Sequence, residues 1–175
     1  MTDINIEPKM QNNRPKIELQ KTAFNYAIEI ASLVILVVTW IYVFLSYSEL
    51  DSEIPVHFNT SGEADRYGDK QSIFLLPILS VVFFFGLSIL NKFPHIFNYP
   101  TEITEENAEK QYKNATNLIR TLNLLIVFIF AFITFNMINA KTENSAVLGE
   151  WFIPSIIIII NLPGLYFLTK AFKKK

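Results

Sequence analysis

The chain has 175 residues, of which 51% are hydrophobic and only 18% charged, with a mean hydropathy of +0.30. A formal net charge of −1 argues against nucleic acid as a partner, and the absence of cysteine excludes disulfides, thiolate catalysis and cysteine metal sites. The apolar residues fall in four runs with nearly all charges between them, which predicts an all-α integral membrane protein with four transmembrane helices.

The first half of the chain is predicted to form a two-helix unit, residues 23–90, behind a polar tail, residues 1–22. Its first apolar run, Phe24 to Tyr47, spans roughly 36 Å as a helix and is long enough to cross a bilayer with some tilt. Its second apolar run is Ile73 to Leu90. Pro77 lies early in that run and predicts either a kink or the first turn of the helix.

The third span is expected to continue a helix that begins outside the membrane. Residues 91–117 are predicted to be a cytoplasmic linker and helix, with Glu105 and Glu106 in the first turn, where the helix dipole favours them. No Gly or Pro occurs from residue 101 to 148, so this helix could run unbroken into a span over about residues 118–138. The cytoplasmic helix is thus an extension of the third span.

The fourth span is predicted from Phe152 to about Phe172, and with the third it forms a second two-helix unit, residues 118–175. Trp151 precedes it, as expected at a membrane interface. Asn161 and the Pro163-Gly164 pair interrupt the run near its middle. This interruption could expose backbone groups to an internal cavity, or it could be a kink that packing tolerates.

Basic residues are unequally divided between the two sides of the predicted spans. Twelve lie on the side of the termini and the second loop, and three lie on the other side. The positive-inside rule therefore predicts that both termini are cytoplasmic and that the first loop lies outside. The twelve are Lys9, Arg14, Lys16, Lys21, Lys92, Lys110, Lys113, Arg120, Lys170, Lys173, Lys174 and Lys175, and the three are Arg66, Lys70 and Lys141.

The polar loop between the first two spans, residues 49–72, has the features of a small folded unit. Residues 54–59 alternate apolar and other side chains, which is typical of a short extended segment. Residues 59–62 and 67–69 each carry the signature of a turn. A compact extracytoplasmic loop is therefore expected here.

Whether this loop binds a metal is left open by the sequence. His57 and the surrounding acids could gather round a cation, but one His with scattered carboxylates lacks the spacing of a known metal motif. A solvated polar loop is the simpler interpretation. His57 could also titrate near neutral pH and act as a sensor. The acids are Glu49, Asp51, Glu53, Glu63, Asp65 and Asp69.

The spacing of the loop residues resembles a short domain of unknown function in bacterial membrane proteins, which also forms the N-terminal part of SdpI-type bacteriocin immunity proteins. The resemblance covers about residues 30–90 and implies a multi-pass protein of the bacterial cytoplasmic membrane, without an established catalytic mechanism. The matching positions are Pro55, His57, Phe58, Asn59, Gly62, Asp65, Tyr67, Gly68, Lys70 and Pro77.

Polar residues inside the spans are a second set of candidates: Glu29, Arg120 and Asn161. Charges at membrane depth are costly and are usually paired. Glu29 and Arg120 both lie about a turn inside the cytoplasmic edge, and we hypothesise that they pair between the first and third spans. The alternative is that each side chain extends separately to the interface.

No catalytic signature of the GxSxG, HExxH, GxGxxG or Walker A type occurs, so a non-enzymatic protein without a cofactor is predicted. The favoured function is binding, sensing or immunity through the external loop. The alternative is a small ion or solute transporter that uses the polar residues of the spans, and a membrane hydrolase ranks last. The expected partners are the lipid bilayer, an extracellular peptide or toxin, a cytoplasmic protein and a second copy of the chain. The external-loop candidates are Pro55, His57, Asn59, Gly62, Asp65, Tyr67 and Lys70.

Overall fold

The computed structural model describes residues 14–140 and 148–172 and is mostly helical. Its four long helices, together with the adjoining 3₁₀ turns, are each long and apolar enough to cross a membrane. A hairpin of two antiparallel strands lies between the first two helices. The elements are α1 (Ala23–Ser46), η1 (Tyr47–Glu49), β1 (Glu53–Phe58), β2 (Ala64–Asp69), η2 (Lys70–Phe74), α2 (Leu75–Leu90), η3 (Pro94–Ile96), α3 (Ala108–Asn139) and α4 (Phe152–Phe172).

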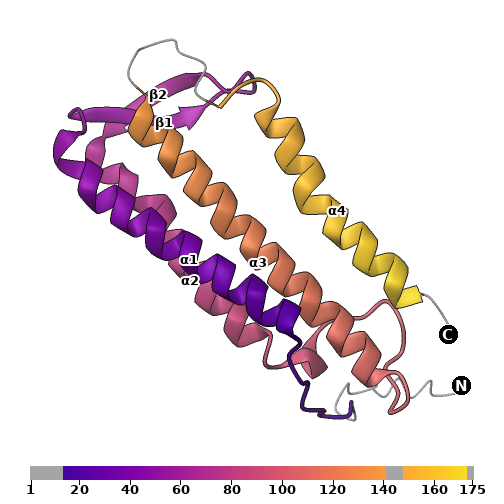
Figure 1. The fold of residues 1–175 in the computed structure, drawn as a ribbon. Helices are drawn as coiled ribbons and strands as arrows, with labels where there is room; N and C mark the ends of the chain where they lie inside the picture. Colours follow the sequence, from indigo (N-terminus) through magenta and orange to yellow (C-terminus); the bar gives the residue numbers. More distant parts are fainter. Residues whose placement is uncertain (1–13, 141–147, 173–175) are drawn as a thin grey trace, which may run out of the picture.

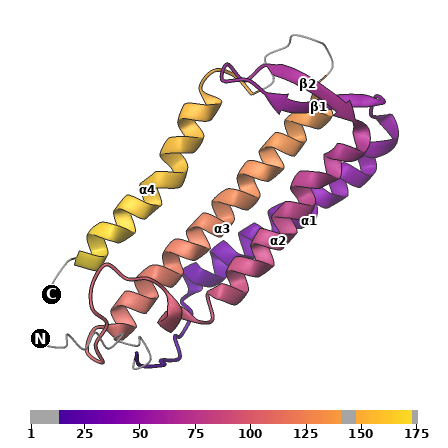
Figure 2. The same cartoon turned by 180° about the vertical axis from the view of Figure 1, so that it is seen from behind.

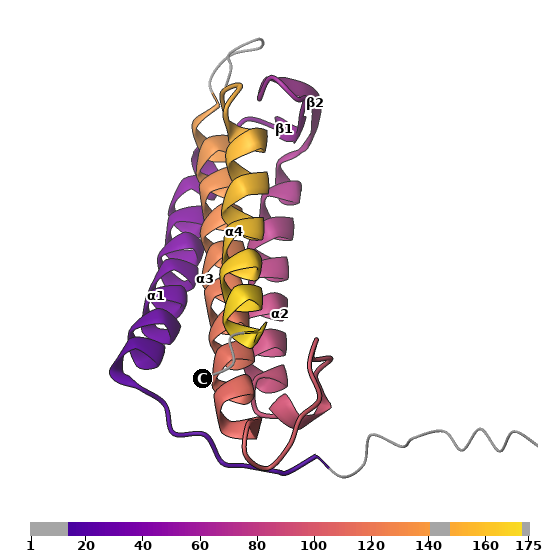
Figure 3. The same ribbon diagram turned by 90° about the vertical axis from the view of Figure 1, so that its right-hand side faces the viewer.

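The four helices lie side by side, with the hairpin at one end of the bundle (Figures 1 and 2). We call this the hairpin end, and we call the opposite end, where α1 begins and α4 ends, the terminal end. Helix α3 is central: it packs against α1, α2 and α4, whereas α4 packs chiefly against α3. Helices α1 and α2 also contact each other, and in the view of Figure 3 they flank α3. The chain therefore builds a three-helix core with α4 attached to one side.

The bundle places large apolar side chains outside and small polar ones inside. Phe24, Phe44 and Leu45 are among many large hydrophobic residues that are more than half exposed. Ser32 and Thr134 are buried, and each hydroxyl donates to a carbonyl of its own helix, Ile28 O at 2.9 Å and Phe130 O at 2.8 Å. Such an arrangement suits lipid as the surrounding solvent, because polar groups are satisfied within the protein.

The first two predicted spans are confirmed as helices. Helix α1 begins with Thr22 as N-cap, whose hydroxyl accepts from Asn25 N while Asn25 Oδ1 accepts from Thr22 N. Pro77 is the third residue of α2, where the lack of an N–H costs nothing. The sequence left open whether Pro77 kinks the second helix or lies in its first turn, and the structure places it in the first turn.

The start of the third helix was predicted too early. Helix α3 begins at Ala108, so Glu105 and Glu106 precede it, and Glu109 lies in its first turn. The reason is the side chain of Asn107, which accepts from Thr104 N at 2.9 Å and donates to Glu102 O at 2.9 Å. These bonds stabilise a turn before the helix. The expected unbroken continuation into the span is confirmed.

Helix α4 runs continuously from Phe152 to Phe172 through Pro163. Two amide side chains of α3 hold it near the terminal end: Gln111 Nε2 donates to Ala171 O at 2.9 Å, and Asn114 Nδ2 donates to Phe167 O at 2.7 Å. The tail residues 1–13, the loop residues 141–147 with Lys141, and the basic residues 173–175 lie outside the described residues.

Candidate functional site

The hairpin is fixed to the bundle through its first strand, with Ile54 at the centre of the contact. Ile54, which is 3% exposed, packs with Val43 of α1, Ile73 of η2 and Met137 of α3. Pro55 beside it is also buried. Because one strand residue contacts three separate elements, the hairpin is a rigid cap on the hairpin end and not a free loop.

An irregularity in the strand pairing brings His57 and Asp65 together. Ile54 pairs with Gly68 and Pro55 with Tyr67, but the register shifts on both sides of His57. The His57 Nδ1 atom then lies 2.5 Å from Asp65 Oδ1, and the two side chains are 51% and 44% exposed. The sheet thus presents an imidazole–carboxylate pair to solvent.

The tip of the hairpin is built around Asn59. Its Oδ1 accepts from the backbone N–H groups of Ser61 at 2.9 Å and Glu63 at 3.0 Å, and its Nδ2 donates to Glu63 Oε2 at 3.1 Å. The backbone N of Asn59 also donates a hydrogen bond to Glu63 O, and its carbonyl accepts one from Gly62 N. The turn predicted at residues 59–62 is therefore confirmed, and Asn59 has a structural role in it.

The second predicted turn, at residues 67–69, is wrong: these residues belong to β2. A Cβ atom at Gly68 would lie 3.2 Å from Val56 Cγ1, so the glycine serves close packing between the strands. Asp69 ends the strand and caps η2, where its Oδ1 accepts from Gln71 N at 2.7 Å.

Gly62 joins the hairpin tip to the segment before α4. Its carbonyl accepts from Leu148 N at 3.1 Å, and its φ of +77° favours glycine. A Cβ atom here would lie only 2.5 Å from the carbonyl oxygen of Gly149. The glycine therefore permits a close approach between two backbones that are far apart in the sequence.

Lys70 and Tyr67 complete the set of external-loop candidates. The backbone N of Lys70 donates to Ser52 O at 3.1 Å, and its ammonium lies 4.9 Å from the centre of the Tyr47 ring. Tyr67 pairs with Pro55 across the sheet. Of the seven candidates, His57 and Asp65 are thus the ones whose polar groups face outward without an evident role in packing.

Within residues 14–140 and 148–172, no group of three or more His, Asp or Glu side chains is placed to hold a metal ion. The acids of the loop are distributed along the hairpin, and only Asp65 contacts His57. His95 lies in η3 at the terminal end, far from His57 in β1. The two histidines do not share a site.

A cluster of charges lies between α1 and α3 near the terminal end. Glu29 Oε1 accepts from Arg120 Nε at 2.9 Å, as hypothesised from the sequence, and Glu29 Oε2 accepts from Lys21 Nζ at 2.6 Å. Lys21 was not foreseen as a partner, because it precedes the helix and sequence spacing gives no sign that the chain turns back. Beside the cluster, Asn25 Nδ2 donates to Asn117 Oδ1 at 2.6 Å.

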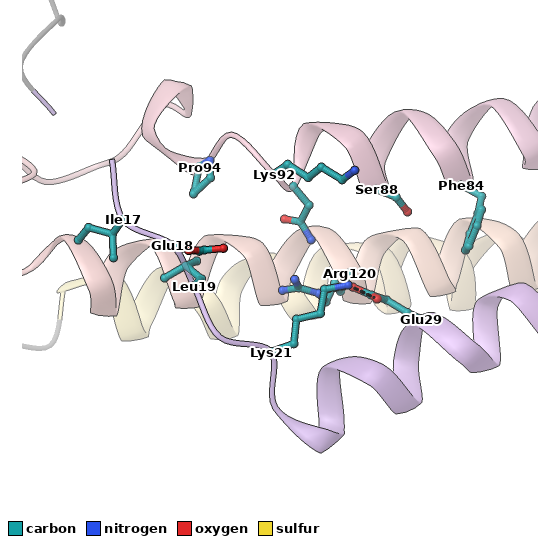
Figure 4. Close-up of a pocket in the computed structure, with 11 residues that line it drawn as sticks. Ile17, Glu18, Leu19, Lys21, Glu29, Phe84, Ser88, Lys92, Pro94 and Arg120 are labelled. Carbon is teal, nitrogen blue, oxygen red and sulfur yellow. Dashed lines mark hydrogen bonds and ion pairs between the residues drawn. The ribbon is translucent and has the colours of Figure 1, made fainter. Parts of the chain in front are cut away.

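These charges line a pocket of about 380 Å³ (Figure 4). Its walls come from the segment before α1, from α1, α2 and α3, and from the connection after α2. A second space of about 10 Å³, which has room for about one water molecule, shares several of its walls. The residues of the larger pocket are Ile17, Glu18, Leu19, Lys21, Glu29, Phe84, Ser88, Asn91, Lys92, Pro94 and Arg120.

The segment before α1 is tied down, which gives this pocket a fixed wall. Arg14 Nη1 donates to Phe97 O at 2.5 Å, and the hydroxyl of Tyr112 donates to Pro15 O at 3.1 Å. Burial raises the pKa of the Tyr99 phenol, and its hydroxyl donates to Pro94 O at 2.9 Å. The segment thus lies across the α2–α3 connection in a defined position.

Asn161, the third intramembrane candidate, lies apart from this cluster. It is exposed on α4, and its Nδ2 donates to Ile157 O of the same helix at 2.7 Å. Of the three candidates, the structure brings Glu29 and Arg120 together and leaves Asn161 outside the three-helix core.

Four helices long and apolar enough to cross a membrane, three of which enclose buried polar side chains, indicate a multi-pass membrane protein. Residues 34–81 match the family model described as "Domain of unknown function (DUF1648)". This range runs from α1 through the hairpin into α2, so the short domain expected from the loop residues is confirmed there.

One relative is an uncharacterized protein of Archaeoglobus fulgidus, which is 29% identical over 77 residues. The alignment covers 39% of this chain and 42% of the relative, so the chain matches less than half of that protein's length. No solved structure matches the chain.

Proposed function

We propose that this membrane protein binds an extended cationic peptide through its hairpin and catalyses no reaction. The observation that carries the proposal is a rigid two-stranded sheet with one open edge. Strand β1 packs against α3 and η2 as well as β2, whereas the extensive contacts of β2 within the described residues are with β1 alone. A peptide can add to such an edge as a further strand, with main-chain hydrogen bonds supplying affinity.

The charge of the hairpin favours a basic partner. Residues 47–70 contain six acidic and two basic residues, a formal net charge of −4. Asp65 is half exposed on the outer strand, and Glu63 is exposed beside the tip. Opposite charges on the peptide would speed its association and fix its register on β2.

We place the hairpin outside the cell, in a bacterial cytoplasmic membrane with both termini in the cytoplasm. The distribution of basic residues supports this orientation. The resemblance of the loop to SdpI-type immunity proteins supports a secreted peptide or toxin as the ligand. Because the chain has no cysteine, the orientation is tested by single cysteines at Thr60 and Glu105. An impermeant reagent applied to intact cells should label only the cysteine at position 60. Labelling of only the cysteine at position 105 would show that the topology is the reverse of the one proposed.

Peptide binding is tested with the full chain in nanodiscs. The probes are two ten-residue peptides that alternate Val with Lys or Val with Glu. We expect the Lys peptide to bind and the Glu peptide not to bind. A Lys peptide with N-methylated backbone should also fail, since it cannot form the ladder of a third strand.

Asp65→Asn should weaken binding of the Lys peptide by about fivefold, which corresponds to an exposed ion pair of about 1 kcal/mol. Asp51→Asn is the matched control, because it makes the same charge change in the same loop but outside the strands. Equal binding by the methylated peptide, or equal effects of the two variants, would remove the basis for strand addition.

A second candidate function is a small ion or solute transporter, and the pocket that contains Glu29 and Arg120 supports it. Proteoliposomes test it directly: a transporter should show substrate-dependent flux that is lost in Glu29→Gln. Binding of the Lys peptide without any such flux would favour peptide binding over transport as the function.

A further inference from the structure

We propose that the pocket at the terminal end is a binding site for a phosphate ester that carries a hydroxyl group, such as the glycerol phosphate unit of an anionic lipid. This site lies at the opposite end of the bundle from the hairpin, and the proposal does not rest on peptide binding at the hairpin. The charges of the pocket, its unpartnered donors and acceptors, and its depth support such a ligand.

The pocket has more positive than negative charge available to a ligand. Three cationic side chains line it, Lys21, Lys92 and Arg120, against the carboxylates of Glu18 and Glu29. Both oxygens of Glu29 are already paired, one with Lys21 and one with Arg120. Because one carboxylate serves two cations, the cluster keeps an excess positive charge that favours an anion.

Arg120 supplies free donors for that anion. Its side chain is only 11% exposed, and it uses Nε to bind Glu29. Among the described residues, its two terminal nitrogens have no hydrogen-bond or ion-pair partner. A guanidinium that presents two adjacent N–H groups matches the geometry of a phosphate. Lys92, which is exposed and makes no side-chain bond to a described residue, stands at the same pocket as a second cation.

The inner part of the pocket offers acceptors. Asn91 Oδ1 and Asn123 Oδ1 are buried without a hydrogen-bond partner in the described residues. Asn123 is 6% exposed, and its Nδ2 already donates to Phe84 O at 3.1 Å. Both asparagines line the small space of about 10 Å³ beside the pocket. A buried acceptor without a donor is costly, so a ligand hydroxyl or a water that it holds would satisfy these groups.

The depth of the pocket suits the headgroup of a lipid. Glu29 lies six residues into α1, about 9 Å along the helix axis. The polar layer of each leaflet is about 5–7 Å thick, so the charge cluster would lie near its boundary with the hydrocarbon where α1 enters the membrane at its first residue. Figure 4 shows Lys92 and Arg120 on different elements of the pocket wall. A phosphate between them would lie at its usual depth in the membrane.

The experiment measures how two phosphate esters change the thermal unfolding of the purified full chain in a neutral detergent. Phosphatidylglycerol presents the group on a lipid, glycerol 3-phosphate presents it free, and diacylglycerol is the lipid without phosphate. We expect phosphatidylglycerol or glycerol 3-phosphate to raise the unfolding temperature with a saturable concentration dependence. A shift with the lipid alone assigns the site to a headgroup, and a shift with glycerol 3-phosphate assigns it to a soluble ester.

Three variants locate the binding. Lys92→Gln should weaken it by about fivefold, since an exposed charge contributes about that much. Lys16→Gln, which makes the same change at an exposed residue outside the pocket, should alter it less than about twofold, and Glu18→Gln should strengthen it. Equal shifts from diacylglycerol and phosphatidylglycerol, equal losses in Lys92→Gln and Lys16→Gln, or no shift with either ester would overturn the proposal.

Discussion

Replacement of Gly62 by alanine should release the hairpin tip from the segment before α4. The φ angle of +77° is costly for any residue with a Cβ, and the added Cβ would lie 2.5 Å from Gly149 O and 2.6 Å from Gly149 N. Both of these are backbone atoms, so no side-chain rotation can remove the clash. The tip must move away, and the hydrogen bond from Leu148 N to Gly62 O must lengthen or break.

The size of this effect follows from its two parts. A left-handed backbone angle costs an alanine about 1–2 kcal/mol, and the lost hydrogen bond adds about 1 kcal/mol. Together they weaken the contact by about 2–3 kcal/mol, so the amide proton of Leu148 should exchange roughly 30- to 140-fold faster.

Hydrogen exchange with mass spectrometry on the protein in detergent measures this rate, and Gly164→Ala is the matched control. A Cβ at Gly164 meets no atom within 4 Å, so the control variant should leave the exchange of Leu148 unchanged. If Gly62→Ala protects Leu148 as well as the control does, the close approach of these two backbones is not a feature of the protein in solution.

Three further sets of substitutions test the contacts that hold the hairpin and the charge cluster in place. Ile54→Ala should destabilise the hairpin end by about 3 kcal/mol, seen as a lower unfolding temperature, because it leaves a cavity among residues that are nearly all buried. Asn59→Ala should weaken the tip by about 1–2 kcal/mol, seen as faster amide exchange at Glu63, and unchanged exchange would mean that the side chain does not hold the turn. Reversal of either charge in the Glu29–Arg120 pair should lower the yield of folded protein in the membrane, and the double reversal should restore part of it. Restoration is incomplete because Lys21 also binds Glu29, and no restoration at all would contradict the pair.

Much of the fold follows from the sequence because the bilayer imposes simple rules on it. An apolar run of about twenty residues is expected to form a helix in lipid, and the four runs correspond to α1, α2, the later part of α3 and α4. The alternating residues 54–59 and the Asn-Thr-Ser-Gly run likewise predict a strand and a tight turn from local chemistry alone. The pairing of Glu29 with Arg120 could be predicted as well, because each charge needs a partner at that depth.

What the sequence could not supply is the position of segments that meet from a distance. Gly68 has the sequence context of a turn residue, yet it lies within β2, where a Cβ would come within 3.2 Å of Val56 Cγ1. Gly62 reads as an ordinary turn glycine, and its contact with Gly149 depends on where the fourth helix begins. Lys21 joins Glu29 from the segment before α1, which is itself bound at Arg14 and Pro15.

The sequence by itself determined that this is a four-helix membrane protein with a folded polar cap, because hydrophobic length and local turn chemistry depend only on neighbouring residues. The tertiary structure alone decided which candidates pack or hold a turn and which are left exposed. Burial of Ile54 fixes the cap and leaves the His57–Asp65 pair exposed on it. Packing of α1, α2 and α3 forms the pocket around Arg120, since a cavity is a property of surfaces brought together by the fold.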